Sequence, residues 1–304
     1  MRYFLLAAAV VAAANVPARA ETLYGLTNLQ QLVSFDNSAR NVTSTVSLPF
    51  SITGEILVGI DVRPATSELY ALSNQNNIYK INPVTGAATQ VGVTLNPALT
   101  GTLRALDFNP TVDRIRLLGS GGAVTNLRAH PDTGVVTEDG DHAFAAGDSN
   151  AGETPAVVNG AYTNSFAGAT TTTLYDLDAG NDVLATQLPP NNGTLNTIGP
   201  VGFDLATSGG FTGFDISGAT GTAYLVGNNL VGGGLAANSL YQVNLATGSA
   251  TVLGAVSGVN GSFRDIAVAP AVIPEPATIG LLASSLVIAA LWRRRANAVV
   301  HAVR

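Results

Sequence analysis

The chain has 304 residues and no cysteine, so no disulfide can stabilise its fold. Its formal net charge is −6, and the segment Glu21–Val272 is more acidic still, with eight Arg or Lys against nineteen Asp or Glu. This charge repels phosphate backbones and argues against nucleic-acid binding. Because that segment holds only His130 and His142, a zinc site built from several histidines is excluded as well.

The first predicted element is a secretory signal peptide over residues 1–20. Arg2 precedes the apolar run "YFLLAAAVVAAA", and the small-residue ending "ARA" before Glu21 is typical of a cleavage site. We therefore expect export across the inner membrane and a mature chain that begins at Glu21.

Residues 21–271 are predicted to form an all-β domain. Short alternating runs such as "SELYALS" and "SLYQVNLATG" are separated by turn signals, and no window shows sustained helical periodicity. The same order of four strands repeats in Leu57–Gly92, Leu103–Gly140, Pro155–Gly199 and Phe211–Gly254. A repeat of four strands and this length is typical of a β-propeller blade.

The two ends of this domain supply the parts of one further blade. Leu23–Pro49 contains three strand-like runs, and Phe263–Pro270 is an isolated fourth run at the other end. We predict five four-stranded blades, with the last closed by a clasp between strands from both termini. An open sandwich is the alternative architecture.

The sequence after this domain has a composition of its own, over residues 272–304. Pro274, Glu275 and Pro276 precede an apolar segment over residues 277–292, which predicts a short transmembrane helix, and Arg293, Arg294 and Arg295 follow. This order resembles the PEP-CTERM sorting tail of Gram-negative bacteria. The resemblance implies recognition by an exosortase-type sorting protease, transient membrane contact and delivery to the cell surface or the medium.

The middle of the chain carries a second resemblance. The runs "RALDFNP", "DRIRLL", "NLRAHPDTG" and "QLPPNNGTLNTIG" resemble an uncharacterised bacterial family, domain of unknown function 4394, over about Leu23–Pro270. This resemblance implies a secreted propeller-like domain without an assigned activity. The catalytic residues, if there are any, remain unknown at this stage.

Aspartates recur at one position of the predicted first strands. Asp61, Asp107 and Asp215 are equivalent, Asn159 lies near that position in another repeat, and Asp265 lies two residues before it in the isolated last strand. First strands line the central channel of a propeller, so these side chains could hold a cation such as Ca²⁺. The alternative is that each one bonds the backbone of a neighbouring blade.

A second candidate cation site is the acidic segment Thr137–Glu153. Its oxygen-bearing side chains suit Ca²⁺, although their spacing does not match an EF-hand: Asp139, Asp141, Asp148, Asn150 and Glu153. A solvated acidic turn is the alternative interpretation.

The third blade holds a predicted basic face. Alternation places Arg114 and Arg116 on one side of a strand, and it places Asn126, Arg128 and His130 together on the next. One interpretation is a network that joins this blade to Asp176 and Asp178 of the fourth. The other is a cleft where Arg116 and Arg128 bind the carboxylate of an acidic sugar, aided by Tyr162 and Asn164.

Two classes of function remain after these observations. The first is a propeller of the cell surface or exopolysaccharide matrix that binds a glycan or an extracellular protein. The second is an extracellular lyase or hydrolase acting on polysaccharide, since a glycosidase needs only two facing carboxylates and many pairs exist here. An inert structural role is the third possibility.

Overall fold

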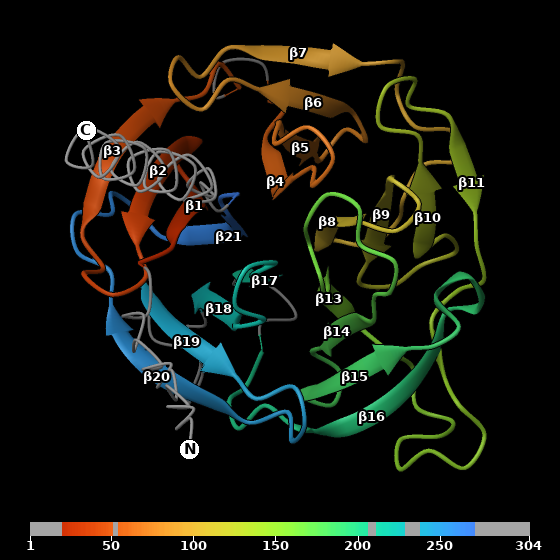
Figure 1. The fold of residues 1–304 in the computed structure, drawn as a ribbon. Coiled ribbons are helices and arrows are strands. Elements are labelled where there is room, and N and C mark those ends of the chain that lie inside the picture. Colours follow the sequence, from red (N-terminus) through yellow and green to blue (C-terminus); the bar gives the residue numbers. More distant parts are fainter. Residues whose placement is uncertain (1–19, 51–53, 206–210, 229–237, 271–304) are drawn as a thin grey trace, which may run out of the picture. The chain divides into compact units, whose positions relative to one another are not determined.

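Twenty-one strands and one short 3₁₀ helix (Pro190–Asn192) make up the computed structural model, which describes residues 20–50, 54–205, 211–228 and 238–270. The strands form five mainly antiparallel sheets that follow one another around a central axis (Figure 1). The prediction of a five-bladed β-propeller is therefore confirmed. Residues 1–19 and 271–304, which include the predicted signal peptide and sorting tail, lie outside the described residues. Among the residues described, no helix is long and apolar enough to cross a membrane.

Four of the blades begin with their inner strand and proceed outwards along the chain. The second blade contains β4 (Leu57–Val62), β5 (Leu69–Ser73), β6 (Ile78–Ile81) and β7 (Ala88–Val91). The third contains β8 (Arg104–Asn109), β9 (Arg114–Gly119), β10 (Asn126–Ala129) and β11 (Val136–Glu138). The fourth contains β13 (Val157–Tyr162), β14 (Leu174–Asp178), β15 (Val183–Gln187) and β16 (Thr194–Pro200). The fifth contains β17 (Phe211–Ile216), β18 (Ala223–Asn228), β19 (Ser239–Val243) and β20 (Ala250–Ala255).

The remaining blade, which we call the closing blade, joins the two ends of the domain. Its inner strand β21 (Phe263–Val268) pairs with β1 (Thr22–Thr27), which is followed by β2 (Gln31–Asp36) and β3 (Val42–Ser47). The predicted clasp is thus present. Glu21 adds a link to the fifth blade, because its carboxylate accepts hydrogen bonds from Ser217 and from the Tyr224 hydroxyl, the latter at 2.7 Å.

The fourth sheet differs from the prediction by one extra strand. β12 (Ala143–Phe144) lies parallel to β16 at the outer edge of this blade. The chain must pass from the outer edge of the third blade to the inner strand of the fourth, and it passes along β16 on the way. Pairing there satisfies backbone groups that an edge strand would otherwise leave exposed.

Apolar side chains fill the interfaces between neighbouring blades. Leu106, Phe108 and Leu117 of the third blade pack with Tyr70 and Leu72 of the second, for example. The cluster between the third and fourth blades has the fewest buried apolar residues, namely Leu118, Phe144, Val157, Val183, Ala185 and Leu195. Buried polar groups occupy the rest of that interface, as described below.

The inner strands approach one another closely around the axis. A Cβ atom added to Gly213 of β17 would lie 2.6 Å from the Cα atom of Asp265 on β21. Only glycine fits at such a distance. This approach places the side chains of all five inner strands within reach of one another.

Candidate functional site

Three aspartates meet at the centre of the ring. The carboxylates of Asp61, Asp107 and Asp215, on β4, β8 and β17, have oxygen atoms within 4.8 Å of one another, and all three residues are buried. Each carboxylate also accepts a hydrogen bond from the backbone N–H of the next blade's inner strand. The donors are Phe108 at 2.8 Å, Tyr162 at 3.0 Å and Val268 at 2.5 Å, respectively.

The other two blades have alanine at this position and form the same link from a residue two places earlier. Asn159 of the fourth blade donates to the backbone oxygen of Thr212 at 3.0 Å. Asp265 of the closing blade accepts from the N–H of Ile60 at 2.8 Å. Asn159 and Asp265 also bond each other across the channel, at 2.9 Å. The five side chains, which we call the axial ring, thus bond every blade to the next.

The axial ring places acidic groups in a buried environment. Burial raises the pKa of Asp265 to about 8 and that of Asp215 to about 6. Burial, together with the neighbouring carboxylates, raises the pKa values of Asp61 and Asp107 well above the ordinary range. The sequence offered two interpretations of these aspartates, and the hydrogen bonds observed are those of the second, in which each side chain bonds the backbone of a neighbouring blade. Asp61, Asp107 and Asp215 are also the one group of potential metal ligands found among the described residues, and a cation there stays a prediction.

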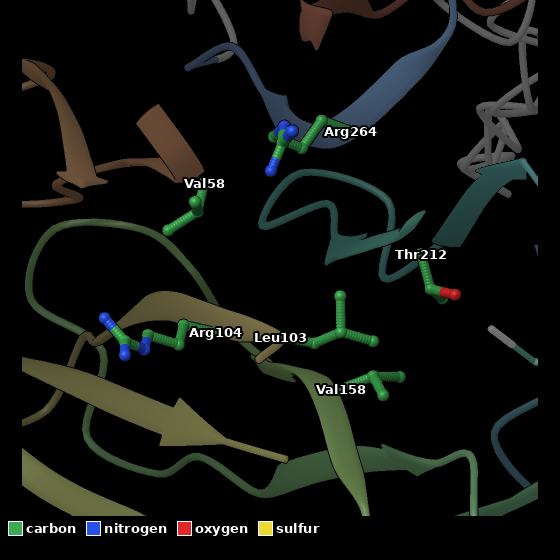
Figure 2. Close-up of a pocket in the computed structure, with 6 residues that line it drawn as sticks. All are labelled: Val58, Leu103, Arg104, Val158, Thr212 and Arg264. Carbon is green, nitrogen blue, oxygen red and sulfur yellow. The ribbon is translucent and has the colours of Figure 1, made fainter. Parts of the chain in front are cut away.

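A small pocket lies at one end of the same channel. It is lined by Leu103 and by one residue from each inner strand: Val58, Arg104, Val158, Thr212 and Arg264. Each of these five stands three positions before the axial position of its blade, which is occupied by Asp61, Asp107, Ala161, Asp215 and Ala267. We call the five residues the mouth ring. Figure 2 shows them around one opening, with the guanidinium of Arg104 turned away from the other side chains.

The mouth ring is small and partly open to solvent. Its cavity volume is about 20 Å³. This space fits one or two waters or one small polar group. A complete sugar does not fit inside it, so a larger ligand would insert only one substituent.

The two arginines of the mouth ring differ from those elsewhere in the molecule. Burial lowers the pKa of both Arg104 and Arg264, and Asp265 offsets only part of this effect on Arg264. Carboxylates instead raise the pKa of Arg63 and Arg128. Arg104 donates to the backbone oxygens of Gly101 and Asn74, at 3.0 and 2.7 Å. Positive charge in the mouth ring is therefore partly desolvated, and an anion bound there would stabilise it.

The predicted basic face lies in the interface between the third and fourth blades. Arg116 is 1% exposed and donates to Asp139 at 2.6 Å, Asn126 at 2.7 Å, Asn191 at 2.9 Å and Tyr162 at 3.2 Å. Arg128 pairs with the same Asp139 at 2.6 Å. This geometry agrees with the network interpretation, because the guanidinium groups of Arg116 and Arg128 bond to side chains of the protein itself.

The partners in this network differ from the expected ones. Asp139 pairs with Arg116 in place of Asp176, whose two carboxylate oxygens are buried and have no hydrogen-bond partner in the described part of the chain. Asp178 accepts instead from the backbone of Ala156 and Asn181. Sequence alternation placed Asp176 on the correct face, but it could not reveal that the turn after β11 brings Asp139 nearer.

The remaining predicted ligand-binding residues do not join Arg116. Asn164 donates to the backbone oxygen of Thr171 at 2.9 Å, within its own loop. Arg114 donates to the backbone oxygen of Asp113 at 2.9 Å, at the end of the β8–β9 hairpin remote from Arg104. His130 lies beyond the end of β10, where its ring accepts from the N–H of Asp132.

The polar side chains of the acidic segment Thr137–Glu153 bond to different partners. Asp139 binds the two arginines, Asp141 accepts from Thr125 at 3.0 Å, and Asp148 accepts from Thr197 at 2.6 Å. Asn150 donates to the Thr197 hydroxyl, and Glu153 is exposed. Binding of Ca²⁺ by this segment stays a prediction, and the geometry does not gather the five side chains around one point.

A second hollow lies at the strand ends of the fifth blade. It is a groove of about 480 Å³ whose polar lining is uncharged, with Thr222, Gln242, Asn244 and Thr251 among its residues. The groove is large enough for a sugar, but no aromatic ring lines it for stacking.

Sequence reasoning identified the axial aspartates but missed the mouth ring. Its members are two valines, two arginines and one threonine, so no single recurring residue marks the position in the repeat. Each member stands three positions before the axial position of its repeat, and this spacing would have identified all five from the sequence.

Five antiparallel blades around a channel define the protein as a β-propeller. The model of the family described as "Domain of unknown function (DUF4394)" matches residues 31–267, and the chain belongs to that family. No curated protein sequence matches it.

Three solved structures are similar in overall arrangement. A protein of unknown function from Bacteroides caccae is 10% identical, with a TM-score of 0.41, and the match covers 83% of this chain and 99% of that one. A protein of unknown function from Bacteroides thetaiotaomicron VPI-5482 is 12% identical, with a TM-score of 0.46 and coverages of 83% and 68%. The dihydro-heme d1 dehydrogenase NirN is 9% identical, with a TM-score of 0.37 and coverages of 81% and 48%.

Proposed function

We propose that the protein is an exported propeller of the cell surface or exopolysaccharide matrix that binds an acidic extracellular glycan at the mouth ring, without catalysing a reaction. The observation that carries this proposal is the pocket at one end of the channel, which both Arg104 and Arg264 line in a strongly acidic domain. The pocket is at the position where the five blades converge, so ligand contacts can come from several blades at once.

Although the domain as a whole is acidic, the local charge at this end of the channel favours an anionic ligand. Only eight Arg or Lys occur between Glu21 and Val272, and two of them line the pocket. Burial lowers the pKa of both guanidinium groups, so an anion replaces solvation that they have lost. A carboxylate or another acidic substituent of a polysaccharide provides such an anion.

The sequence signals at the two ends support export. The apolar segment before Glu21 and the Pro-Glu-Pro tail with its three arginines are the basis for placing the protein outside the cytoplasm, sorted by an exosortase-type protease. In that location, an acidic exopolysaccharide is an available ligand class.

The test uses the mature domain, residues 21–270, with a polyuronate and the neutral polymer dextran. We expect the polyuronate to bind and dextran to bind at least about tenfold more weakly. Arg264→Gln should reduce binding to the polyuronate by a similar factor, whereas Arg114→Gln, at the opposite end of the blades, should not.

Three results would overturn the proposal. Equal binding of the polyuronate and dextran would show that the negative charge of the ligand does not contribute to binding. Loss of binding in Gln242→Ala but not in Arg264→Gln would assign the ligand to the groove of the fifth blade. Release of new reducing or unsaturated ends from the polyuronate would show that the protein is a hydrolase or lyase.

A further inference from the structure

Three of the five mouth-ring residues stand at irregularities of their inner strands. The pairing of β4 with β5 passes from Leu57 to Gly59, so Val58 is an extra residue without a partner. The same shift occurs at Val158 in β13 and at Arg264 in β21. All three β-bulges therefore fall at the same position of the blade, and all three bulged residues line the pocket.

A bulge changes the direction in which a side chain points. In a regular strand, alternate side chains face the two neighbouring blades, and a bulged residue departs from this alternation. Here the bulges bring Val58, Val158 and Arg264 to the mouth of the channel, where Leu103 adds an apolar contact. Val58 and Val158 thus make two sides of the pocket apolar, and the bulge in β21 adds the positive charge of Arg264.

A polar side chain from the neighbouring blade, Thr212, also lines the pocket, and in Figure 2 its hydroxyl points away from Arg264. Thr212 lies on β17, which is adjacent to β21 in the ring, and it is 5% exposed. Its hydroxyl is buried and has no hydrogen-bond partner within the described ranges. A buried hydroxyl without a partner is costly, and a ligand that accepts its hydrogen bond removes the cost.

We propose that the mouth ring binds a single carboxylate group, which accepts hydrogen bonds from the Arg264 guanidinium and, after rotation about the Cα–Cβ bond, from the Thr212 hydroxyl. This inference rests on the proposed function and specifies the ligand as a uronate: a sugar whose carboxylate enters the pocket while its ring stays outside. The planar fork of a guanidinium matches the two oxygens of a carboxylate.

The size of the pocket distinguishes a carboxylate from other anions. The cavity volume is only about 20 Å³, and Val58, Val158 and Leu103 limit it on the apolar side. A flat carboxylate needs less room than tetrahedral sulfate or phosphate. The axial ring lies behind the pocket, where Asp265 bonds to Ile60 and Asn159, so the channel does not extend to accept a longer group.

The experiment measures competition by small anions for polyuronate binding to residues 21–270. Glucuronate and acetate, at up to tens of millimolar, are expected to displace the polymer, whereas sulfate and glucose are not. Thr212→Val, which is close in shape, should weaken glucuronate binding about fivefold, and Arg264→Lys about tenfold or more. The matched controls Thr111→Val and Arg114→Lys, at the remote ends of the strands, should leave it unchanged.

A variant that fills the pocket tests the site without altering its charge. Val58→Phe should abolish competition by glucuronate while the melting transition stays cooperative. If Arg264→Lys does not fold, Val58→Phe and Thr212→Val still decide the question.

The outcomes separate this inference from the proposed function. If no polyuronate binds, the proposed function is wrong. If the polymer binds through Arg264 but sulfate displaces it and glucuronate does not, the function stands and the carboxylate inference is wrong. Unchanged glucuronate binding in both Thr212→Val and Val58→Phe would also overturn the inference.

Discussion

At the scale of single residues, the molecule uses its few basic side chains in two ways. Arg63, Arg116 and Arg128 pair with carboxylates and join segments that are distant in the sequence. Arg104 and Arg264 line the end of the channel, where burial lowers their pKa values. The first use stabilises the fold, and the second gives the pocket its charge.

Removal of Arg116 tests the first use. Arg116→Ala removes the guanidinium that donates to Asn126 Oδ1, Asn191 Oδ1 and the Tyr162 hydroxyl, although Arg128 still pairs with Asp139. We expect a loss of about 2–5 kcal/mol in the free energy of unfolding, measured by denaturant titration, with polyuronate binding unchanged. The control Arg114→Ala should cost far less. A stable Arg116→Ala protein that no longer binds ligand would favour the cleft interpretation instead.

Raised pKa values in the axial ring predict an unusual dependence of stability on pH. A carboxyl group whose pKa is raised by folding stabilises the protein fully below its unfolded pKa and loses that contribution as the pH rises through the folded pKa. For Asp215 and Asp265 the folded values are about 6 and about 8. The melting temperature should therefore fall between about pH 4 and pH 8.

The variant Asp265→Asn isolates one contribution to this dependence. Whatever its absolute melting temperature, the decline between about pH 6.5 and pH 8.5 should become shallower, because one titrating group is gone. A wild-type melting temperature that rises over this range would contradict the assignment of these groups.

At the scale of strands, the closing blade does more than complete a sheet. β21 pairs with β1. Its Val268 N–H donates to the carboxylate of Asp215, and its Asp265 carboxylate accepts from the N–H of Ile60 on β4. It also carries the bulge that places Arg264 in the mouth ring. Ring closure and the pocket therefore depend on the same strand.

Deletion of β21 tests this dependence. A chain that ends at Ser262 loses the inner strand of one blade and both of its axial links, and exposes the inner edge of β1. We expect its cooperative thermal transition to be lost, because several unsatisfied backbone groups at about 1–3 kcal/mol each approach the stability of a whole domain. A chain that ends at Pro270 keeps β21 and is the control. Equal melting temperatures for the two chains would rule out the clasp as a stabilising element.

At the scale of the whole molecule, the axial ring bonds all five blades into a closed ring. Each inner strand is linked to the next by one side chain, and Asn159 and Asp265 bond across the channel. A domain without disulfides thus has a polar network on its axis, in addition to the apolar interfaces between blades. A stable ring of this kind suits a protein that works outside the cytoplasm, as we propose.

Sorting can be tested in the full chain. Replacement of Pro274, Glu275 and Pro276 by alanine is expected to retain the protein in the inner membrane, because the motif that resembles an exosortase signal is removed while the apolar segment over residues 277–292 remains. Cell fractionation measures the outcome. Release of this variant at the wild-type level would show that these residues are not the sorting signal.

The sequence by itself determined the strands, the number of blades and the way in which the ring closes. These features depend on alternation within short segments and on a repeat that returns the same turn in every blade, so they are local and can be read from neighbouring residues. The recurrence of Asp61, Asp107 and Asp215 likewise placed them on one axis. Even the substitution of Asp265 for the missing aspartate of the closing blade was visible in the sequence.

Only the tertiary structure decided which polar groups meet. Asp139 reaches Arg116 because a turn folds back over the third blade, while Asp176, on the expected face, has no hydrogen-bond partner among the described residues. The bulges at Val58, Val158 and Arg264 depend on the register between two strands, and no property of either strand alone specifies that register. The mouth ring exists because residues at one equivalent position of all five blades meet around one axis, and they meet only when the ring is closed.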